Sequence, residues 1–159
     1  MSNHNRNYVK VEMAAISENV SFARIVAAGF IAQLDPTVEE VSDIKTAVSE
    51  AVTNAIIHGY ENVTGNVTEN VSENVSENVT MQLSSVGRDI TIEVSDKGVG
   101  IENVEAVREP MFTTKPDLER SGLGFTVMES FMDSVEIKST LGAGTTVVLT
   151  KKLTEALLQ

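Results

Sequence analysis

The chain has 159 residues, of which 42% are hydrophobic, and this length and composition predict one globular domain with a core of its own. It contains no cysteine and 2 histidines, which excludes a disulfide framework, an iron–sulfur cluster and a thiol nucleophile, and disfavours a structural zinc site. Its 12 Lys and Arg against 23 Asp and Glu give a net charge of -11, which disfavours nucleic-acid binding and favours basic partners. No apolar run reaches membrane-spanning length and the first residues have no signal-peptide core, so we expect a cytoplasmic protein that binds no membrane.

The first predicted elements are a strand and a helix. Residues 8–13 alternate apolar and polar side chains, which is typical of a strand with one buried face. Ser17 stands where a helix N-cap is expected, and apolar side chains at helical spacing continue to about Leu34. Asp35 and Pro36 follow, and a proline disfavours helical geometry in the residue before it, so we expect the helix to end there.

A second helix is expected to begin at a capping box. Thr37 and Glu40 have the spacing at which each side chain satisfies a backbone donor of the first helical turn. Apolar side chains at helical spacing follow to about Ile57, and Gly59 is placed to end the helix. Residues 61–80 then repeat Asn-Val units with a period of four. Because these residues are poor helix formers, we predict an expanded loop or a strand extension, with a helix as the alternative.

The remaining elements follow from the same patterns. They are strands at 79–86, 90–95, 135–138 and 145–151, and helices at 101–108 and 124–132. Residues 87–89 predict a hairpin turn, 109–122 a long loop and 141–144 a second turn, and the tail after Leu153 is expected to be helical. The order β-α-α-β-β-α-β-β predicts an α+β fold, a two-layer sandwich whose mixed, mostly antiparallel sheet has helices on one face.

Two polar clusters indicate ligand chemistry. Glu50 and Asn54 are four residues apart on one helix face, where a carboxylate can accept a proton and an amide oxygen can ligate Mg²⁺. The alternative is a solvated patch on an amphipathic helix. Asp96 directly follows a strand, and Gly98 and Gly100 let the backbone turn sharply and approach a ligand closely. The alternative there is an ordinary turn at the exit of a strand.

A third cluster is rich in glycine and opens a helix. Ser121, Gly122 and Gly124 precede or begin the helix expected at 124–132, and the backbone amides of a helix N-terminus attract anions. Lys115 and Arg120, just upstream, add positive charge suited to phosphates. The spacing is that of neither a P-loop nor a dinucleotide-binding fingerprint.

Taken together, the three clusters resemble the N box, the adenine-binding motif and the glycine box of the Bergerat-fold ATPases, which include gyrase and the histidine kinases. Within that superfamily, the chain is similar to the anti-sigma F factors of spore-forming bacteria. The similarity covers nearly the whole chain except the Asn-Val repeat and the last residues. The segments that carry it are Glu18–Arg24, Lys45–Tyr60, Glu109–Pro116, Leu118–Phe125 and Met128–Asp133.

The resemblance implies a role for each matching residue. Glu50 would be the general base that takes a serine proton, and Asn54 would hold the Mg²⁺ that bridges the ATP phosphates. Asp96 would accept a hydrogen bond from the adenine amino group. The other residues of the nucleotide site would be Gly98, Gly100, Thr113, Thr114, Lys115, Arg120, Ser121, Gly122 and Gly124.

The resemblance also implies a function for residues 1–159 as one ATP-binding kinase domain, with the repeat at about 61–80 as an insertion. Such a protein inhibits the sporulation sigma factor F and phosphorylates a serine of the antagonist protein, with ADP or ATP gating the choice of partner. A homodimer is implied, and Arg24 is a candidate partner contact, or else a solvated arginine. Two alternatives are a kinase of the general stress response and a non-catalytic nucleotide-binding anti-sigma module; the intact Glu50 argues against the second.

Overall fold

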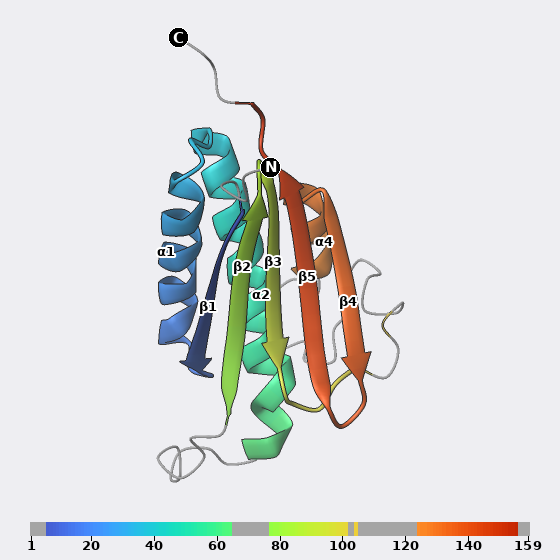
Figure 1. Ribbon diagram of the computed structural model, residues 1–159. Coiled ribbons are helices and arrows are strands. Elements are labelled where there is room, and N and C mark those ends of the chain that lie inside the picture. The colour runs from blue at the N-terminus through green and yellow to red at the C-terminus, as the bar shows by residue number, and fades with distance from the viewer. Residues whose placement is uncertain (1–5, 65–76, 102–103, 105–123, 156–159) are drawn as a thin grey trace.

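A computed structural model describes residues 6–64, 77–101, 104 and 124–155, and of residues 58–64 the backbone alone. Its elements are β1 (Arg6–Ala14), α1 (Glu18–Ala32), α2 (Val38–Thr64), β2 (Asn78–Val86), β3 (Asp89–Asp96), α4 (Gly124–Phe131), β4 (Ser134–Thr140) and β5 (Gly144–Lys152). The strands form one sheet in the order β1-β2-β3-β5-β4, and α1, α2 and α4 lie against one of its faces (Figure 1). The predicted α+β sandwich is therefore confirmed. Its described strand pairings are all antiparallel.

The core lies between the sheet and the helices. Leu83 of β2 and Ile92 of β3 are Cα partners on the face that the helices cover, and both are fully buried. Ile44, Val48 and Val52 follow one another every four residues along α2 and are also fully buried. The alternating burial of the strands and the four-residue spacing on α2 thus bring two apolar surfaces together. Truncating such a residue to alanine typically costs about 2–5 kcal/mol.

The start of α2 is predicted correctly, whereas its end is not. The backbone N–H of Thr37 donates to Glu40 Oε1 at 2.8 Å, and the N–H of Glu40 donates to Thr37 Oγ1 at 3.0 Å, which is a complete capping box. The helix then continues through Gly59 to Thr64. A glycine costs about 1 kcal/mol inside a helix, and adding a residue to an established helix gains a backbone hydrogen bond. The first residues of the repeat are accordingly helical, and residues 78–80 extend β2 as predicted.

The other boundaries match the expected elements within a few residues. Ser17 precedes α1, but its backbone is helical and its side chain caps nothing; instead, Asn19 Nδ2 donates to the carbonyl of Ala14 at 2.8 Å. Of the tail in which a helix is expected, Thr154 and Glu155 are not helical, and the last four residues lie outside the described part. The helix expected at 101–108 and the loop expected at 109–122 also lie outside it, apart from Ile101 and Val104. Among the described residues, no helix is both long and apolar enough to cross a membrane.

Candidate functional site

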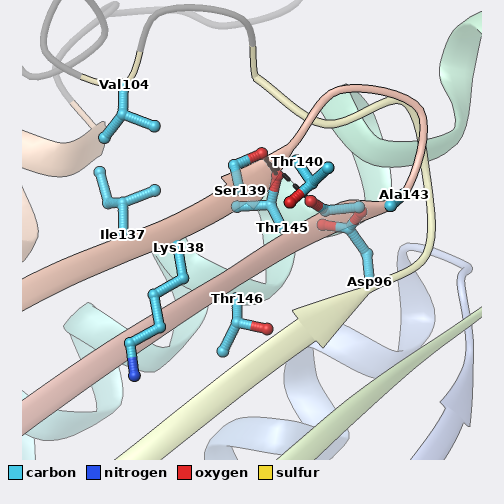
Figure 2. Close-up of a pocket in the computed structure, with 10 residues that line it drawn as sticks. Asp96, Val104, Ile137, Lys138, Ser139, Thr140, Ala143, Thr145 and Thr146 are labelled. Carbon is cyan, nitrogen blue, oxygen red and sulfur yellow. Dashed lines mark hydrogen bonds between the residues drawn. The ribbon is translucent and has the colours of Figure 1, made fainter.

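A pocket of about 540 Å³ opens at the edge of the sheet where β3 ends and β4 turns into β5 (Figure 2). That volume is within the usual range for sites that bind small molecules. The lining residues are Asp96, Val104, Ile137, Lys138, Ser139, Thr140, Ala143, Gly144, Thr145 and Thr146. The C-terminal part of α2 reaches the same edge of the molecule (Figure 1).

Asp96 supplies a half-buried carboxylate to this pocket. It is the last residue of β3 and pairs with Thr145 at the start of β5. The backbone N–H of Gly98 donates to Asp96 Oδ1 at 2.9 Å. Burial raises the pKa of Asp96 above its ordinary value, while hydrogen bonds from the backbone of Gly98 and Thr145 act in the opposite direction. A half-buried carboxylate of this kind accepts a hydrogen bond from a ligand that carries a donor.

Two glycines allow the backbone to close around the pocket. Gly100 has φ +75°, and a Cβ added there would lie 2.3 Å from the carbonyl oxygen of Thr140. Gly144 has φ +117°, and a Cβ there would lie 2.1 Å from the carbonyl oxygen of Asp96. The close approach predicted at Gly100 therefore takes place against the chain's own β4. A side chain at either position would force β3 and the β4–β5 turn apart.

The sequence reasoning missed Ser139 and Thr145, which complete this end of the pocket. Their hydroxyl oxygens lie 2.8 Å apart. The backbone N–H of Ile101 donates to Ser139 Oγ at 2.7 Å, and Ser139 Oγ donates to the carbonyl of Gly144 at 3.1 Å. The Gly-Thr-Thr segment that opens β5 was the available signal, but the pairing depends on the register of β4 against β5.

Glu50 and Asn54 lie one turn apart on α2, as predicted, and both are partly buried. Neither is among the residues that line the pocket. The side-chain nitrogen of Asn54 is buried and has no hydrogen-bond partner within the described structure. A buried amide nitrogen without a partner suggests that a ligand normally contacts this side chain. Exchanging the positions of the amide nitrogen and oxygen would present the oxygen to that ligand instead.

Asn54 therefore fits the Mg²⁺ role that the resemblance implies. Magnesium usually takes one or two protein oxygens and completes its shell with water and substrate phosphates. Across the part of the chain that the structure describes, no group of three or more acidic or histidine side chains could hold a metal ion.

Of the glycine-rich cluster, only Gly124 is among the residues that the structure describes. Gly124 is buried and is the first residue of α4, which packs against α2. The predictions for Thr113, Thr114, Lys115, Arg120, Ser121 and Gly122 lie outside the described residues. Arg24 is exposed on α1 and contributes nothing to the pocket.

The far end of α4 is attached to the rest of the fold by Lys151 of β5. Lys151 Nζ donates to the carbonyl of Phe131, the last residue of the helix, at 2.6 Å. The same ammonium group lies 3.7 Å from Asp43 Oδ2 on α2. One side chain of the sheet thus contacts both the end of α4 and α2.

Comparison with known proteins places the fold in a family. Residues 13–151 match the histidine kinase-like ATPase domain. An anti-sigma F factor from Clostridium perfringens (strain SM101 / Type A) is 53% identical over 147 residues, covering 92% of this chain and 97% of that protein. An anti-sigma F factor from Anoxybacillus flavithermus (strain DSM 21510 / WK1) is 52% identical over 151 residues, covering 95% of this chain and 96% of that protein.

Solved structures share the fold at low sequence identity. The RsbU and RsbW domains of Rv1364c from Mycobacterium tuberculosis match with a TM-score of 0.61 and 19% identity, over 92% of this chain and 32% of that chain. The SiaB-SiaC complex from Pseudomonas aeruginosa matches with a TM-score of 0.53 and 12% identity, over 90% of this chain and 88% of that chain. At these identities the likeness concerns the fold alone.

Proposed function

Because the chain belongs to the anti-sigma F factors, within the histidine kinase-like ATPase domains, we propose that it inhibits sigma factor F and phosphorylates a serine of the antagonist protein. The observation that carries this proposal is the 53% identity over 92% of the chain. We further propose that it acts in the cytoplasm during sporulation, as a homodimer, with Arg24 as a contact to its protein partners.

The pocket supports an adenine nucleotide as the ligand. The Asp96 carboxylate accepts hydrogen bonds, and adenine offers a donor in its 6-amino group. Gly100 and Gly144 allow the backbone after β3 and the β4–β5 turn to pack closely at this pocket. The start of α4 at Gly124 would attract the phosphates, because the backbone N–H groups of a helix N-terminus point toward an anion.

Phosphoryl transfer depends chiefly on positioning and on neutralising charge. We assign Glu50 as the base that takes the proton of the attacking serine hydroxyl, and Asn54 as a ligand of Mg²⁺. Magnesium would neutralise charge on the ATP phosphates. The two side chains stand one turn apart on α2, so a single rigid helix would position both.

The test is a phosphotransfer assay with γ-labelled ATP, Mg²⁺ and the antagonist protein. We expect label on a serine of the antagonist, and Glu50→Gln should reduce its rate at least 100-fold while ATP still binds. Glu39→Gln is a matched control, because it removes the same charge from an exposed position on the same helix, and it should leave the rate unchanged.

Each other outcome has a definite meaning. If ATP binds but no label appears on the antagonist, the kinase proposal is contradicted. The remaining interpretation is then a nucleotide-dependent inhibitor, and capture of sigma factor F by the unlabelled protein would identify it. Label that persists in Glu50→Gln would show a kinase whose base is another residue. Capture of a general-stress sigma factor in place of sigma factor F would favour the stress-response alternative.

A further inference from the structure

Two hydroxyl groups at the end of the pocket contact each other, and their other hydrogen bonds determine which one donates and which one accepts. Ser139 and Thr145 are Cα partners on β4 and β5, and Figure 2 shows both side chains at the end of the pocket where Asp96 lies. A hydroxyl group has one proton to donate and two lone pairs that accept. The three contacts of Ser139 Oγ can therefore be assigned one by one.

Two of the three contacts of Ser139 have a fixed direction. The backbone N–H of Ile101 can only donate, so it uses one lone pair of Ser139 Oγ at 2.7 Å. The carbonyl of Gly144 can only accept, so it takes the Ser139 proton at 3.1 Å. In the remaining contact, at 2.8 Å, Thr145 Oγ1 must therefore be the donor and the second lone pair of Ser139 Oγ the acceptor.

This assignment uses the proton of Thr145 and leaves its oxygen as an acceptor toward the pocket. The neighbouring carboxylate of Asp96 is an acceptor as well. We infer that Ser139 is a positioning residue that holds the Thr145 hydroxyl in its accepting orientation, and that it thereby helps the pocket to select a purine with an amino group over one with a 6-oxo group. This inference rests on the proposed nucleotide site and names a specificity determinant within it.

The chain supplies a matched control for Ser139. Ser134 and Thr150 are also a Cα-paired serine and threonine on β4 and β5, and their hydroxyls are in contact too. That pair is absent from the pocket lining. Ser134→Ala therefore removes an equivalent cross-strand hydroxyl contact without touching the pocket.

The experiment measures the dissociation constants of ADP and inosine diphosphate by titration calorimetry. Inosine carries a 6-oxo group where adenosine carries a 6-amino group. We expect the wild-type protein to prefer ADP, and Ser139→Ala to reduce this preference roughly three- to tenfold, because the Thr145 hydroxyl can then rotate and donate. Ser134→Ala should leave the preference unchanged. In a Thr145→Val background, Ser139→Ala should have no further effect on the preference.

The outcomes separate this inference from the proposed function. If Ser139→Ala weakens both nucleotides in the same proportion, Ser139 is merely structural and the inference is wrong. An effect of Ser139→Ala on the preference that persists in Thr145→Val would also overturn it, since Thr145 would not be the intermediary. If the wild-type protein binds neither nucleotide, the proposed nucleotide site itself fails. Thermal unfolding of each variant shows that the compared proteins are folded.

Discussion

At the scale of single residues, the carboxylate of Asp96, which lines the pocket, is a group whose burial opposes folding. It is buried at the end of β3, where backbone N–H groups of Gly98 and Thr145 replace part of its water. Burial raises its pKa, so the folded protein binds this proton more tightly than the unfolded chain does. The protonated form therefore favours folding, and this contribution is lost as the pH rises through the folded pKa. Above that pKa the charged carboxylate reduces stability relative to the protonated form.

We predict that Asp96→Asn stabilises the ligand-free protein at pH 7 and weakens ADP binding. The amide carries no charge to desolvate and its oxygen still accepts from the backbone, so we expect a rise in melting temperature of roughly 2 °C. The gain should shrink as the pH falls through the raised pKa of Asp96 in the folded state, because the wild-type carboxyl group then also becomes neutral. Asp89→Asn, at the exposed start of the same strand, should show neither effect. Equal melting temperatures at pH 7 would contradict the argument.

At the scale of elements, Glu40 and Arg88 together join three segments. Its Oε1 belongs to the capping box of α2, and its Oε2 accepts from the backbone N–H of Thr154 at 2.7 Å. Arg88, in the turn between β2 and β3, donates through Nε to the carbonyl of Thr154 at 2.6 Å and through Nη2 to that of Asp35 at 3.3 Å. The start of α2, the β2–β3 turn and the segment after β5 are thus joined at one end of the sheet.

Glu40→Gln should destabilise the protein by about 1–2 kcal/mol at pH 7. Burial alone would raise the pKa of Glu40, but hydrogen bonds from Thr37 and Thr154 outweigh it and hold the pKa below the ordinary value of 4.5. A lowered pKa stabilises the fold above the unfolded pKa, and the contribution is lost as the pH falls through the folded pKa. Chemical denaturation at pH 7 and at about pH 3 should show the difference narrowing in acid.

The exposed neighbour Glu39 supplies the control for this prediction, because it stands in the same first turn of α2. Glu39→Gln should change the unfolding free energy by a few tenths of a kcal/mol, about the value of one charge near a helix N-terminus. If both variants lost the same stability, helix electrostatics and not the contact with Thr154 would explain the role of Glu40.

Structural features that depend on a local sequence pattern could be predicted, whereas features that depend on tertiary geometry could not. The capping box at Thr37 involves residues three apart, so the sequence alone reveals it. The predicted end of α2 was wrong. The free-energy cost of one glycine at position 59 is smaller than the free energy that the established helix gains by continuing. The contact between Ser139 and Thr145 requires the register of two strands, which no local pattern specifies. The position of Asp96 at a strand end beside a close backbone approach could be predicted, because a strand end followed by two glycines is itself a local signal.

At the scale of the whole molecule, the pocket joins parts of the chain that are distant in sequence. The end of β3, the β4–β5 turn and Val104 all contribute lining residues. β5 lies between β3 and β4 and pairs with both, so it connects the two sides of the pocket (Figure 1). A ligand held there makes contacts that the unfolded chain lacks, so its binding free energy should add to the stability of the entire fold.

We therefore predict that ADP raises the melting temperature of the whole domain in one cooperative step. At a concentration 100 times its dissociation constant, a ligand adds about 2.7 kcal/mol, which corresponds to roughly 5–10 °C for a protein of this size. Differential scanning calorimetry measures the shift, and an equal concentration of inorganic phosphate serves as the control. A melting curve that ADP leaves unchanged would contradict a nucleotide site at this pocket.

The position of β5 inside the sheet, between β3 and β4, also affects when the pocket can form during protein synthesis. On a ribosome, Asp96 is made well before Gly144 and Thr145, which stand opposite it at the start of β5. β4 emerges earlier than β5 as well, yet β5 is its partner in the described sheet. A nascent chain that ends before β5 therefore carries Asp96 on β3 and the lining residues of β4, but lacks the strand that pairs with both. The described lining of the pocket is therefore complete only after β5 has been translated and has paired between β3 and β4.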